Sequence, residues 1–427
     1  MPASNLPPTP DPRDGPLPIP RKRGRPKRRK ATATDLVGAK HVRHLQGYLD
    51  HLHEAYDHPN RGLHYDTFLV AHVLAFFSPT LRSTRTIEDF SQLPEVQKIL
   101  GVECICRNTF SQGSKLFDPA LLAPLIRDLR QRIPDLRGGD PQLHTILQKI
   151  VAADGSFFNI AADVAWALHH TKRNGQEQGR VRLDFQLDVL RWVPEQIAVS
   201  GQAQGSETAA QRKMLEKGVI YLLDRNYVDF EYLKAVLAGE SDFVLRTRSN
   251  APNFRVEREL PLSLLDGEHG VISDRLGYLP GSGGDTPAPP PQMLRELVMA
   301  DPTTGKPIRI LTSLLELPAY IIGLLYRHRW QIELFFRWLK VFACFRHLIS
   351  HSANGLSIQF YVAVIGTLLM YAHSGRRPSK YAFSLLACVA GGQAQLEDIL
   401  PILERRERER EVARARLARK KDEKRKA

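Results

Sequence analysis

Cysteine is scarce in this sequence, because its 427 residues include only Cys104, Cys106, Cys344 and Cys388. Four cysteines in a chain this long form no disulfide framework, so we expect a reducing compartment, by default the cytosol. The first residues, MPASNLPPTPDPRDGP, lack the apolar stretch of a secretory signal. The longest apolar run, Phe360 to Tyr371, is shorter than the ~18 residues that a membrane span needs. We therefore expect a buried helix there, and no membrane partner.

Spacing typical of zinc sites is also missing. Cys104 and Cys106 are separated by one residue, and the histidines between His41 and His72 follow no zinc-site pattern. Surface or core positions explain these side chains better than a zinc centre does.

The net charge is concentrated at the two ends of the chain. The formal charge is +14, and residues 21–30 (RKRGRPKRRK) contain eight Lys or Arg and no acid. Residues 404–427 contain twelve basic and six acidic side chains, so the two segments account for the whole excess. The middle of the chain is formally neutral, and we expect the ends to bind a polyanion, most simply nucleic acid.

Residues 1–38 are rich in Pro, Lys and Arg and poor in large apolar side chains. Such a segment cannot offset the entropy of folding, so we predict a disordered basic arm. Within it, Arg23-Gly24-Arg25-Pro26 resembles an AT-hook, whose Arg23 and Arg25 would enter a narrow A·T-rich minor groove. A generic basic tail or a nuclear-localisation-like run is the alternative.

Residues 39–145 show apolar side chains at helical spacing, which predicts a helical N-terminal domain. Two segments in it, Ser91 to Gly101 and Arg107 to Phe117, could form a helix-turn-helix DNA reader. A compact helical bundle gives the same pattern, so both interpretations stand.

The pattern changes to strands at Ile146, and residues 146–250 predict about five strands of an α/β catalytic core. An apolar run from Ile150 ends at Asp154-Gly155-Ser156, and Gly218 to Leu223 leads directly to Asp224. Residues 251–315 alternate in short pieces around a low-complexity loop, residues 281–291, which indicates a β-rich insertion. We expect the core to resume over residues 316–385 and a charged helical tail over residues 386–427.

The segment Tyr326 to Lys340, YRHRWQIELFFRWLK, predicts one long helix with a polar stripe. At about 100° per residue, Tyr326, Arg329, Glu333 and Lys340 fall within an arc of about 60°, and the other faces are largely apolar. We expect a mostly buried helix whose polar stripe faces a cleft. An ordinary solvated face with ion pairs four residues apart is the alternative.

Three carboxylates stand out by position, because Asp154 and Asp224 lie at predicted strand ends and Glu333 lies on this helix. Each has an ordinary role as alternative: a turn at Asp154, a helix cap at Asp224, and an ion pair of Glu333 with Arg329 or Arg337. If the three converge, they would hold two Mg²⁺ ions about 4 Å apart, as metal-assisted phosphate chemistry requires.

These residues resemble the motifs of the bacterial DDE transposases of the insertion-sequence-four family. The family pattern Y-x2-R-x3-E-x6-K is matched in full by Tyr326, Arg329, Glu333 and Lys340. Asp154-Gly155-Ser156 and Asp224-Arg225-Asn226-Tyr227 are similar to the motifs at the first two acidic positions. Asn226 stands where the family usually has Gly, a mild departure because Asn tolerates left-handed backbone angles. The resemblance spans roughly residues 80–372.

The resemblance implies a ribonuclease-H-like catalytic core that cleaves DNA at transposon ends and transfers the strand into target DNA. Asp154, Asp224 and Glu333 would be the catalytic residues and would bind two Mg²⁺ ions, with Mn²⁺ as a substitute. Tyr326, Arg329 and Lys340 would hold DNA phosphates, to which their side chains can all donate hydrogen bonds. Trp330 would stack on an extruded base, or pack in the core.

The partners implied are double-stranded DNA, at the transposon ends and the target, and a second copy of the chain on that DNA. The location implied is the cytoplasm, on the nucleoid. Two other functions stay open: a domesticated, non-catalytic DNA-binding protein derived from a transposase, and a nuclease of similar fold without strand transfer. The intact set of three carboxylates argues against the domesticated protein. Arg337, about 20° from Tyr326 around the helix, has no assigned role.

Overall fold

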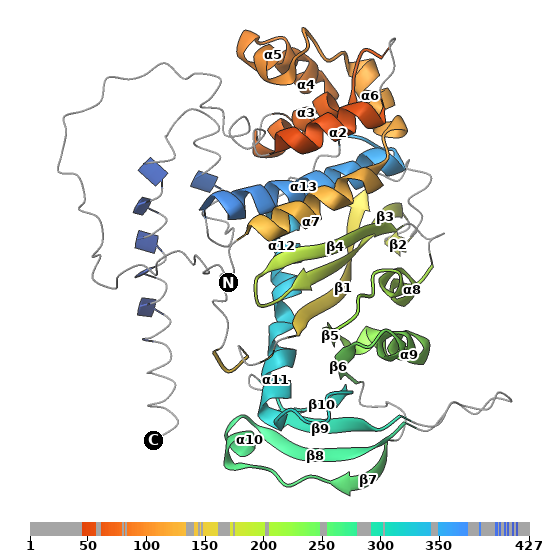
Figure 1. Ribbon diagram of the computed structural model, residues 1–427, viewed down its shortest axis with the longest axis vertical. Coiled ribbons are helices and arrows are strands. Elements are labelled where there is room, and N and C mark those ends of the chain that lie inside the picture. Colours follow the sequence, from red (N-terminus) through yellow and green to blue (C-terminus); the bar gives the residue numbers. More distant parts are fainter. Residues whose placement is uncertain are drawn as a thin grey trace, which may run out of the picture.

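The computed structural model describes residues 45–374, with gaps at 57–60, 79–80, 82, 134–140, 144–145, 147, 161–170, 174–175, 201–204, 248–253, 280–291, 302–303 and 343–348, and scattered residues between 384 and 416. The basic arm with Arg23 and Arg25, the low-complexity loop and most of the C-terminal tail lie outside the described residues. Along the long axis of the molecule, a layer of helices is followed by a sheet with flanking helices (Figure 1).

Helices occupy the range in which a helical domain was predicted. They are α2 (Gln46–Ala55), α3 (Tyr65–Phe77), α4 (Thr84–Ser91), α5 (Pro94–Leu100), α6 (Arg107–Leu116) and α7 (Ala123–Arg132), with short 3-10 helices at Pro119–Leu122 and Pro141–Leu143. Helix α13 (Ala353–Ser374) comes from the other end of the chain and contacts α3, α6 and α7 (Figure 1). The helical layer is therefore built from both halves of the chain.

Helices α5 and α6 coincide with the two segments considered for a helix-turn-helix. Helix α5 begins with Pro94 and ends at Gly101, whose φ of 67° is a left-handed conformation that glycine adopts without strain. Helix α6 packs against α3, α4 and α13. The helix pair exists, and its contact with DNA stays a prediction.

In the described part of the chain, ten strands form one mixed sheet. They are β1 (Lys149–Ile160), β2 (Thr171–Arg173), β3 (Gln176–Asp188), β4 (Val193–Ser200), β5 (Val219–Leu223), β6 (Asp242–Arg246), β7 (Arg255–Glu259), β8 (Val271–Tyr278), β9 (Leu294–Ala300) and β10 (Pro307–Thr312). The order is β2-β3-β1-β5-β6-β10-β9-β8-β7, and β4 pairs with β3. Strands β1, β5 and β6 are parallel, and the other pairings are antiparallel.

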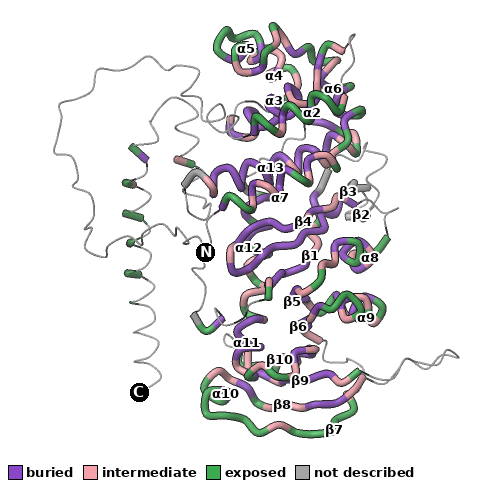
Figure 2. The backbone as a smooth tube through the Cα atoms, viewed as in Figure 1, coloured by how far each residue is buried: buried purple, intermediate pink, exposed green. Residues whose placement is uncertain are grey.

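The parallel strands are covered on both faces, which explains their unbroken apolar sequences. On one face, Ile150 and Ala152 of β1 belong to the core that also includes helices α11 (Ala319–His328) and α12 (Trp330–Phe342). On the other face, Val151 and Ala153 join the core beneath α9 (Phe230–Ala238), next to which α8 (Glu207–Arg212) packs. Residues of β5 are all buried, and those of β6 are buried except at its two ends (Figure 2). The protein is thus an α/β fold, as predicted.

The predicted β-rich insertion does not form a separate layer. Its strands β7 to β10 continue the central sheet, because β10 pairs with β6 through Ile310↔Arg246 to Thr312↔Val244. The short helix α10 (Leu264–Glu268) lies between β7 and β8. Strands β9 and β10 pair antiparallel as a hairpin, from Pro307↔Ala300 to Thr312↔Arg295. The interruption of the core is therefore an extension of its sheet.

The buried helix predicted from the apolar run is α13, and it is longer than that run. Among the described residues, Ala353–Ala372 is the one helix long and apolar enough to cross a membrane, with a mean hydropathy of 1.6. Most of this stretch, 83%, is buried against the rest of the protein, as expected of a core helix.

Candidate active site

Asp154 lies within strand β1, two residues beyond Ala152, the last residue through which β1 pairs with β5. The prediction that it ends its strand is wrong, because β1 continues to Ile160 against β3 and pairs Asp154 with Phe185. The predicted turn alternative at Asp154-Gly155 is equally wrong. Side chains alternate along a strand, so Asp154 continues the face of Ile150 and Ala152, toward α12.

Asp224 follows β5 directly, as predicted from the sequence. Its side chain accepts a hydrogen bond from the backbone N–H of Asn226 at 2.7 Å and so caps the 3-10 helix Arg225–Tyr227. The ordinary capping role is real, and it holds the carboxylate beside Asp154, which it influences electrostatically.

The predicted single helix from Tyr326 to Lys340 is interrupted at Arg329. Helix α11 ends at His328 and α12 begins at Trp330. At the junction the backbone N–H of Arg329 bonds to the carbonyl of Tyr326 at 3.1 Å, and Ile332 to Arg329 at 3.2 Å. These bonds reach back three residues rather than four, so the chain tightens locally while keeping a helical direction.

Arg329 lies between two of the predicted carboxylates. Its Nη1 is 3.7 Å from Oδ2 of Asp154, and its Nη2 forms an ion pair with Glu333. The side chain of Arg329 is only 12% exposed, so this bridge is largely shielded from solvent. The alternative role of Glu333 as an ion-pair partner of Arg329 is therefore observed.

Burial and neighbouring carboxylates raise the pKa of Asp154 from 3.8 to about 7. Burial is the largest cause, and the charge of Glu207 is the second. Arg329 opposes the rise, and Asp224 adds to it. The raised pKa means that the positive charge of Arg329 does not fully compensate the burial of Asp154 and its acidic neighbours.

The other residues of the predicted stripe surround this centre. Tyr326 accepts hydrogen bonds from Arg246 and Arg329, while burial raises its pKa against the opposing effect of both cations. Lys340 is exposed, places its Nζ 5.2 Å from the centre of the Phe158 ring, and interacts electrostatically with Asp154.

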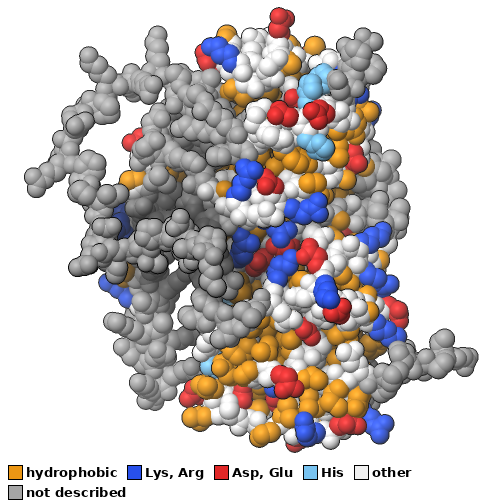
Figure 3. All heavy atoms as spheres, viewed as in Figure 1, with side chains coloured by type: hydrophobic (Ala, Val, Ile, Leu, Met, Phe, Trp, Pro, Cys, Tyr) orange, Lys and Arg blue, Asp and Glu red, His pale blue; other side chains and the backbone are white. Residues whose placement is uncertain are grey.

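The indole of Trp330 is 50% exposed, so the alternative that it packs in the core is wrong. Arg337 is also exposed. The middle of the face drawn in Figure 3 carries mixed acidic and basic side chains, over the region of α8, α12 and β1 in Figure 1.

Sequence reasoning missed Glu207, Tyr227 and Arg246. Glu207 is the first residue of α8, and its Oε1 accepts a hydrogen bond of 2.5 Å from the hydroxyl of Tyr227. Arg246 is the last residue of β6 and faces Tyr326. Tyr227 lay within the quoted motif and could have been found there. Glu207 and Arg246 carry no local signal, because only the fold brings them to Asp154 and Tyr326.

The donor set fits a divalent cation by its chemistry. Carboxylate oxygens are the ligands that Mg²⁺ prefers, and Asp154 is a partly buried carboxyl group, 17% exposed, with two carboxylate neighbours and one cation 3.7 Å away. The part of the chain that the structure describes contains no group of three or more His, Cys, Asp or Glu already arranged around one point. Glu333 is the ligand candidate turned aside, toward Arg329.

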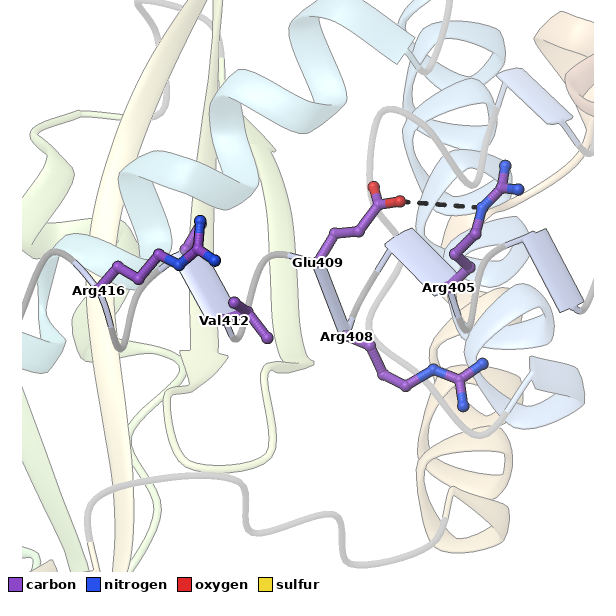
Figure 4. A pocket seen from close by; sticks show the side chains of 6 residues that line it. Arg405, Arg408, Glu409, Val412 and Arg416 are labelled. Atoms are coloured by element: carbon purple, nitrogen blue, oxygen red, sulfur yellow. Dashed lines mark ion pairs between the residues drawn. The ribbon is translucent and has the colours of Figure 1, made fainter.

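The pocket in Figure 4 is unrelated to this centre. Residues of the C-terminal segment alone line it: Arg405, Arg408, Glu409, Val412, Ala413 and Arg416. Arg405 Nε is 3.9 Å from Oε1 of Glu409 there. No residue of the predicted site takes part in this pocket.

The fold and the site together define an α/β protein with an acidic centre beside a row of hydrogen-bond donors, Tyr326, Arg329 and Lys340. The chain belongs to the transposase DDE domain family, whose profile matches residues 146–369, more than half of the sequence.

Among known proteins, the chain is similar to y4zB, a transposase candidate of Sinorhizobium fredii. The two are 30% identical over 202 residues, 47% of this chain and 54% of the relative. A transposase candidate for the insertion sequence element IS4SA of Synechocystis is 22% identical over 284 residues, 63% of this chain and 72% of that protein. The chain therefore spans about half the length of the first of these relatives.

The piggyBac transposase, solved as a synaptic complex with hairpin DNA, superposes with a TM-score of 0.39 and 10% identity. The superposition covers 84% of this chain and 78% of that one. This TM-score is too low to support any inference about fold or function.

Proposed function

We propose that this protein is a DNA transposase of the insertion-sequence-four type, which cleaves transposon ends and joins them to target DNA. The observation that carries the proposal is the placement of Asp154 in a chain of the transposase DDE domain family. The side chain of Asp154 is 17% exposed, lies 3.7 Å from Arg329 and is influenced by the charges of Glu207 and Asp224. The strand order β4-β3-β1-β5-β6, with β1, β5 and β6 parallel, supports a ribonuclease-H-like core.

Asp154, Asp224 and Glu333 would hold two Mg²⁺ ions, or Mn²⁺ in their place. Bound there, the ions would supply the activation of the attacking water or 3′-hydroxyl and the stabilisation of the leaving oxygen. Glu333 becomes available for this task when Arg329 exchanges its ion pair for a DNA phosphate. The same guanidinium thus holds the site together before DNA arrives and binds the strand afterwards.

Tyr326, Arg329 and Lys340 position the phosphate of the strand to be cut. A phenol, a guanidinium fork and an ammonium all donate to phosphate oxygens, and all three lie within reach of Asp154 or of one another. Trp330 is exposed beside them and is free to stack on an extruded base.

The proposal includes the partners and the location. Double-stranded DNA is the substrate, two copies of the chain act on paired ends, and the protein works in the cytoplasm on the nucleoid. Arg23 and Arg25 of the basic arm add contacts in A·T-rich minor grooves.

Cleavage of the chain's own flanking DNA tests the function. The substrate is the DNA around the coding region, with the short inverted repeats found in it, incubated with the full chain and Mg²⁺. We expect wild type to cut at the repeat ends and Asp224→Ala to lose about 10³-fold in rate, since the metal contribution is worth several kcal/mol. Glu231→Gln, at an exposed position of α9, is the matched control that keeps activity. Equal cleavage by Asp224→Ala and wild type would refute the proposal.

A further inference from the structure

Glu207 lies beside the proposed catalytic centre, and the family motifs assign it no role. It opens helix α8, which Ser206 caps by accepting a hydrogen bond from the N–H of Ala209 at 3.2 Å. Helix α8 packs on β1 and β3, so the start of the helix is fixed against the strand that carries Asp154.

The contact between Glu207 and β1 is direct. A Cβ atom built on Gly155 would lie 2.8 Å from Cδ and 3.0 Å from Oε1 of Glu207. Any larger residue at position 155 would therefore displace the carboxylate. The glycine next to Asp154 is what allows the two acidic side chains to approach each other, and the charge of Glu207 acts on Asp154.

Glu207 has a hydrogen-bond partner and no partner of opposite charge among the described residues. The hydroxyl of Tyr227, at 2.5 Å, is its partner. The buried guanidinium whose charge acts on Glu207, that of Arg182, is paired with another residue: its Nε is 2.7 Å and its Nη2 3.2 Å from the oxygens of Asp184. Its Nη1 donates to the carbonyl of Gly205 at 3.2 Å.

A purely structural role does not explain this arrangement. An amide oxygen would accept the hydrogen bond of Tyr227 equally well, without placing a second negative charge beside Asp154. A partly buried carboxylate with a neutral partner is unfavourable unless a cation compensates it.

We propose that Glu207 is a fourth carboxylate of the catalytic centre and strengthens its hold on the divalent cation. The inference rests on the proposed function, because it assumes that Asp154 and Asp224 hold that cation.

Binding of Mn²⁺ to the full chain without DNA tests this inference. The free Mn²⁺ concentration is followed by electron paramagnetic resonance, so that activity plays no part. We expect Glu207→Gln to raise the Kd for Mn²⁺ at least about tenfold, because groups around a metal site change affinity by about 10–100-fold. The glutamine keeps the size of the side chain and the acceptor for Tyr227, so folding should be preserved.

Two control variants isolate the charge. Tyr227→Phe removes the hydrogen bond but keeps the carboxylate, and we expect it to bind Mn²⁺ nearly as wild type does. Glu231→Gln removes an exposed carboxylate from the first turn of the neighbouring helix α9, just as Glu207 lies in the first turn of α8. This variant should leave the Kd for Mn²⁺ unchanged. If Glu207→Gln does not fold, Glu207→Asp replaces it, because it withdraws the carboxylate by one methylene; an unchanged Kd for that variant overturns the inference.

The outcomes separate this inference from the function on which it rests. If Glu207→Gln binds Mn²⁺ like wild type while Asp154→Asn and Asp224→Asn lose binding, Glu207 is only structural and the proposed metal site stands. If neither Asp154→Asn nor Asp224→Asn changes the binding, the proposed metal site itself is refuted, and the inference falls with it.

Discussion

Asp154 is subject to two opposing requirements, because its partly buried position disfavours a negative charge and the proposed cation binding needs one. Its strand pairs with β3 and β5 in the interior of the fold, where a charged carboxylate is costly, yet binding a divalent cation needs that charge. Arg329 compensates it only in part, at 3.7 Å. The fold therefore keeps an unfavourable charge in place, which is what the proposed metal site would require.

The first prediction concerns Asp154→Asn in the absence of divalent cations. The pKa of Asp154 is raised in the folded protein, so between about pH 4 and pH 7 the folded chain retains a proton that the unfolded chain has lost. Stability from this group consequently falls as pH rises through that window and stays low above it. Asparagine does not titrate, so the variant should be more stable than wild type at pH 8, by about 4 kcal/mol at a cost of about 1.4 kcal/mol per pKa unit.

Urea unfolding with a chelator present, at pH 4.5 and at pH 8, measures this difference. The gap between variant and wild type should be small at the lower pH and large at the higher one. Asp89→Asn, at an exposed position of α4, should show no such dependence on pH. A variant less stable than wild type at pH 8 would contradict the assignment of Asp154 as an uncompensated charge.

At the scale of elements, local sequence patterns predicted individual strands and helices, because these depend mainly on residues close in the sequence. The apolar run Gly218 to Leu223 before Asp224 predicted β5, and the apolar run from Ile150 predicted β1. Burial on both faces of β3 depends on the fold instead: Asp184 is fully buried, and α8 packs on this strand. The interruption at Arg329 has no sequence signal such as Pro or Gly. The helical spacing of apolar residues therefore predicted one continuous helix from Tyr326 to Lys340.

The second prediction concerns the packing of α13 on α3. A Cβ atom built on Gly366 would lie 2.3 Å from Cε1 and 2.4 Å from Cδ1 of Phe76. Alanine is the better helix former by about 1 kcal/mol, but overpacking against an aromatic ring costs about 1–3 kcal/mol. We expect the clash to dominate, so that Gly366→Ala lowers the free energy of unfolding by about 1–2 kcal/mol.

Gly47→Ala is the matched control, because Gly47 also lies in a helix and a Cβ built there meets nothing within 4 Å. This variant should be slightly more stable than wild type, through helix propensity alone. Denaturant titration of both variants checks the pair. If Gly366→Ala raises the free energy of unfolding as much as Gly47→Ala does, then α3 and α13 are not packed as closely as described.

At the scale of the whole molecule, the order of the strands in the sheet could not be predicted from the sequence. Nothing local states that β10 pairs with β6, which joins the β-rich segment to the core sheet. Nor does any local pattern bring α13 (Ala353–Ser374) to α3 (Tyr65–Phe77), which lie far apart in the sequence. The three acidic residues could be named because they match motifs, whereas Glu207 became visible only when the fold placed it against Gly155.

The neutral middle and basic ends of the chain lead to the third prediction, on the proposed binding of DNA. Each phosphate neutralised by Lys or Arg contributes about −0.9 to the slope of log K against log salt concentration. Residues 21–30 carry eight basic side chains, so deleting residues 1–38 should make the slope on non-specific duplex DNA less steep by several units.

Deletion of residues 1–20 alone is the control, because it shortens the arm but keeps all eight basic side chains of residues 21–30, and its slope should match wild type.

The double variant Arg23→Ala, Arg25→Ala then separates an AT-hook from a generic basic tail. A hook predicts a larger loss of affinity on A·T-rich than on G·C-rich duplexes, since the narrow groove concentrates negative potential. A generic tail predicts equal losses on both. An unchanged salt slope after deletion of residues 1–38 would show that the folded middle, despite its formal neutrality, supplies the phosphate contacts, with Arg329, Lys340 and Arg337 as the first residues to substitute.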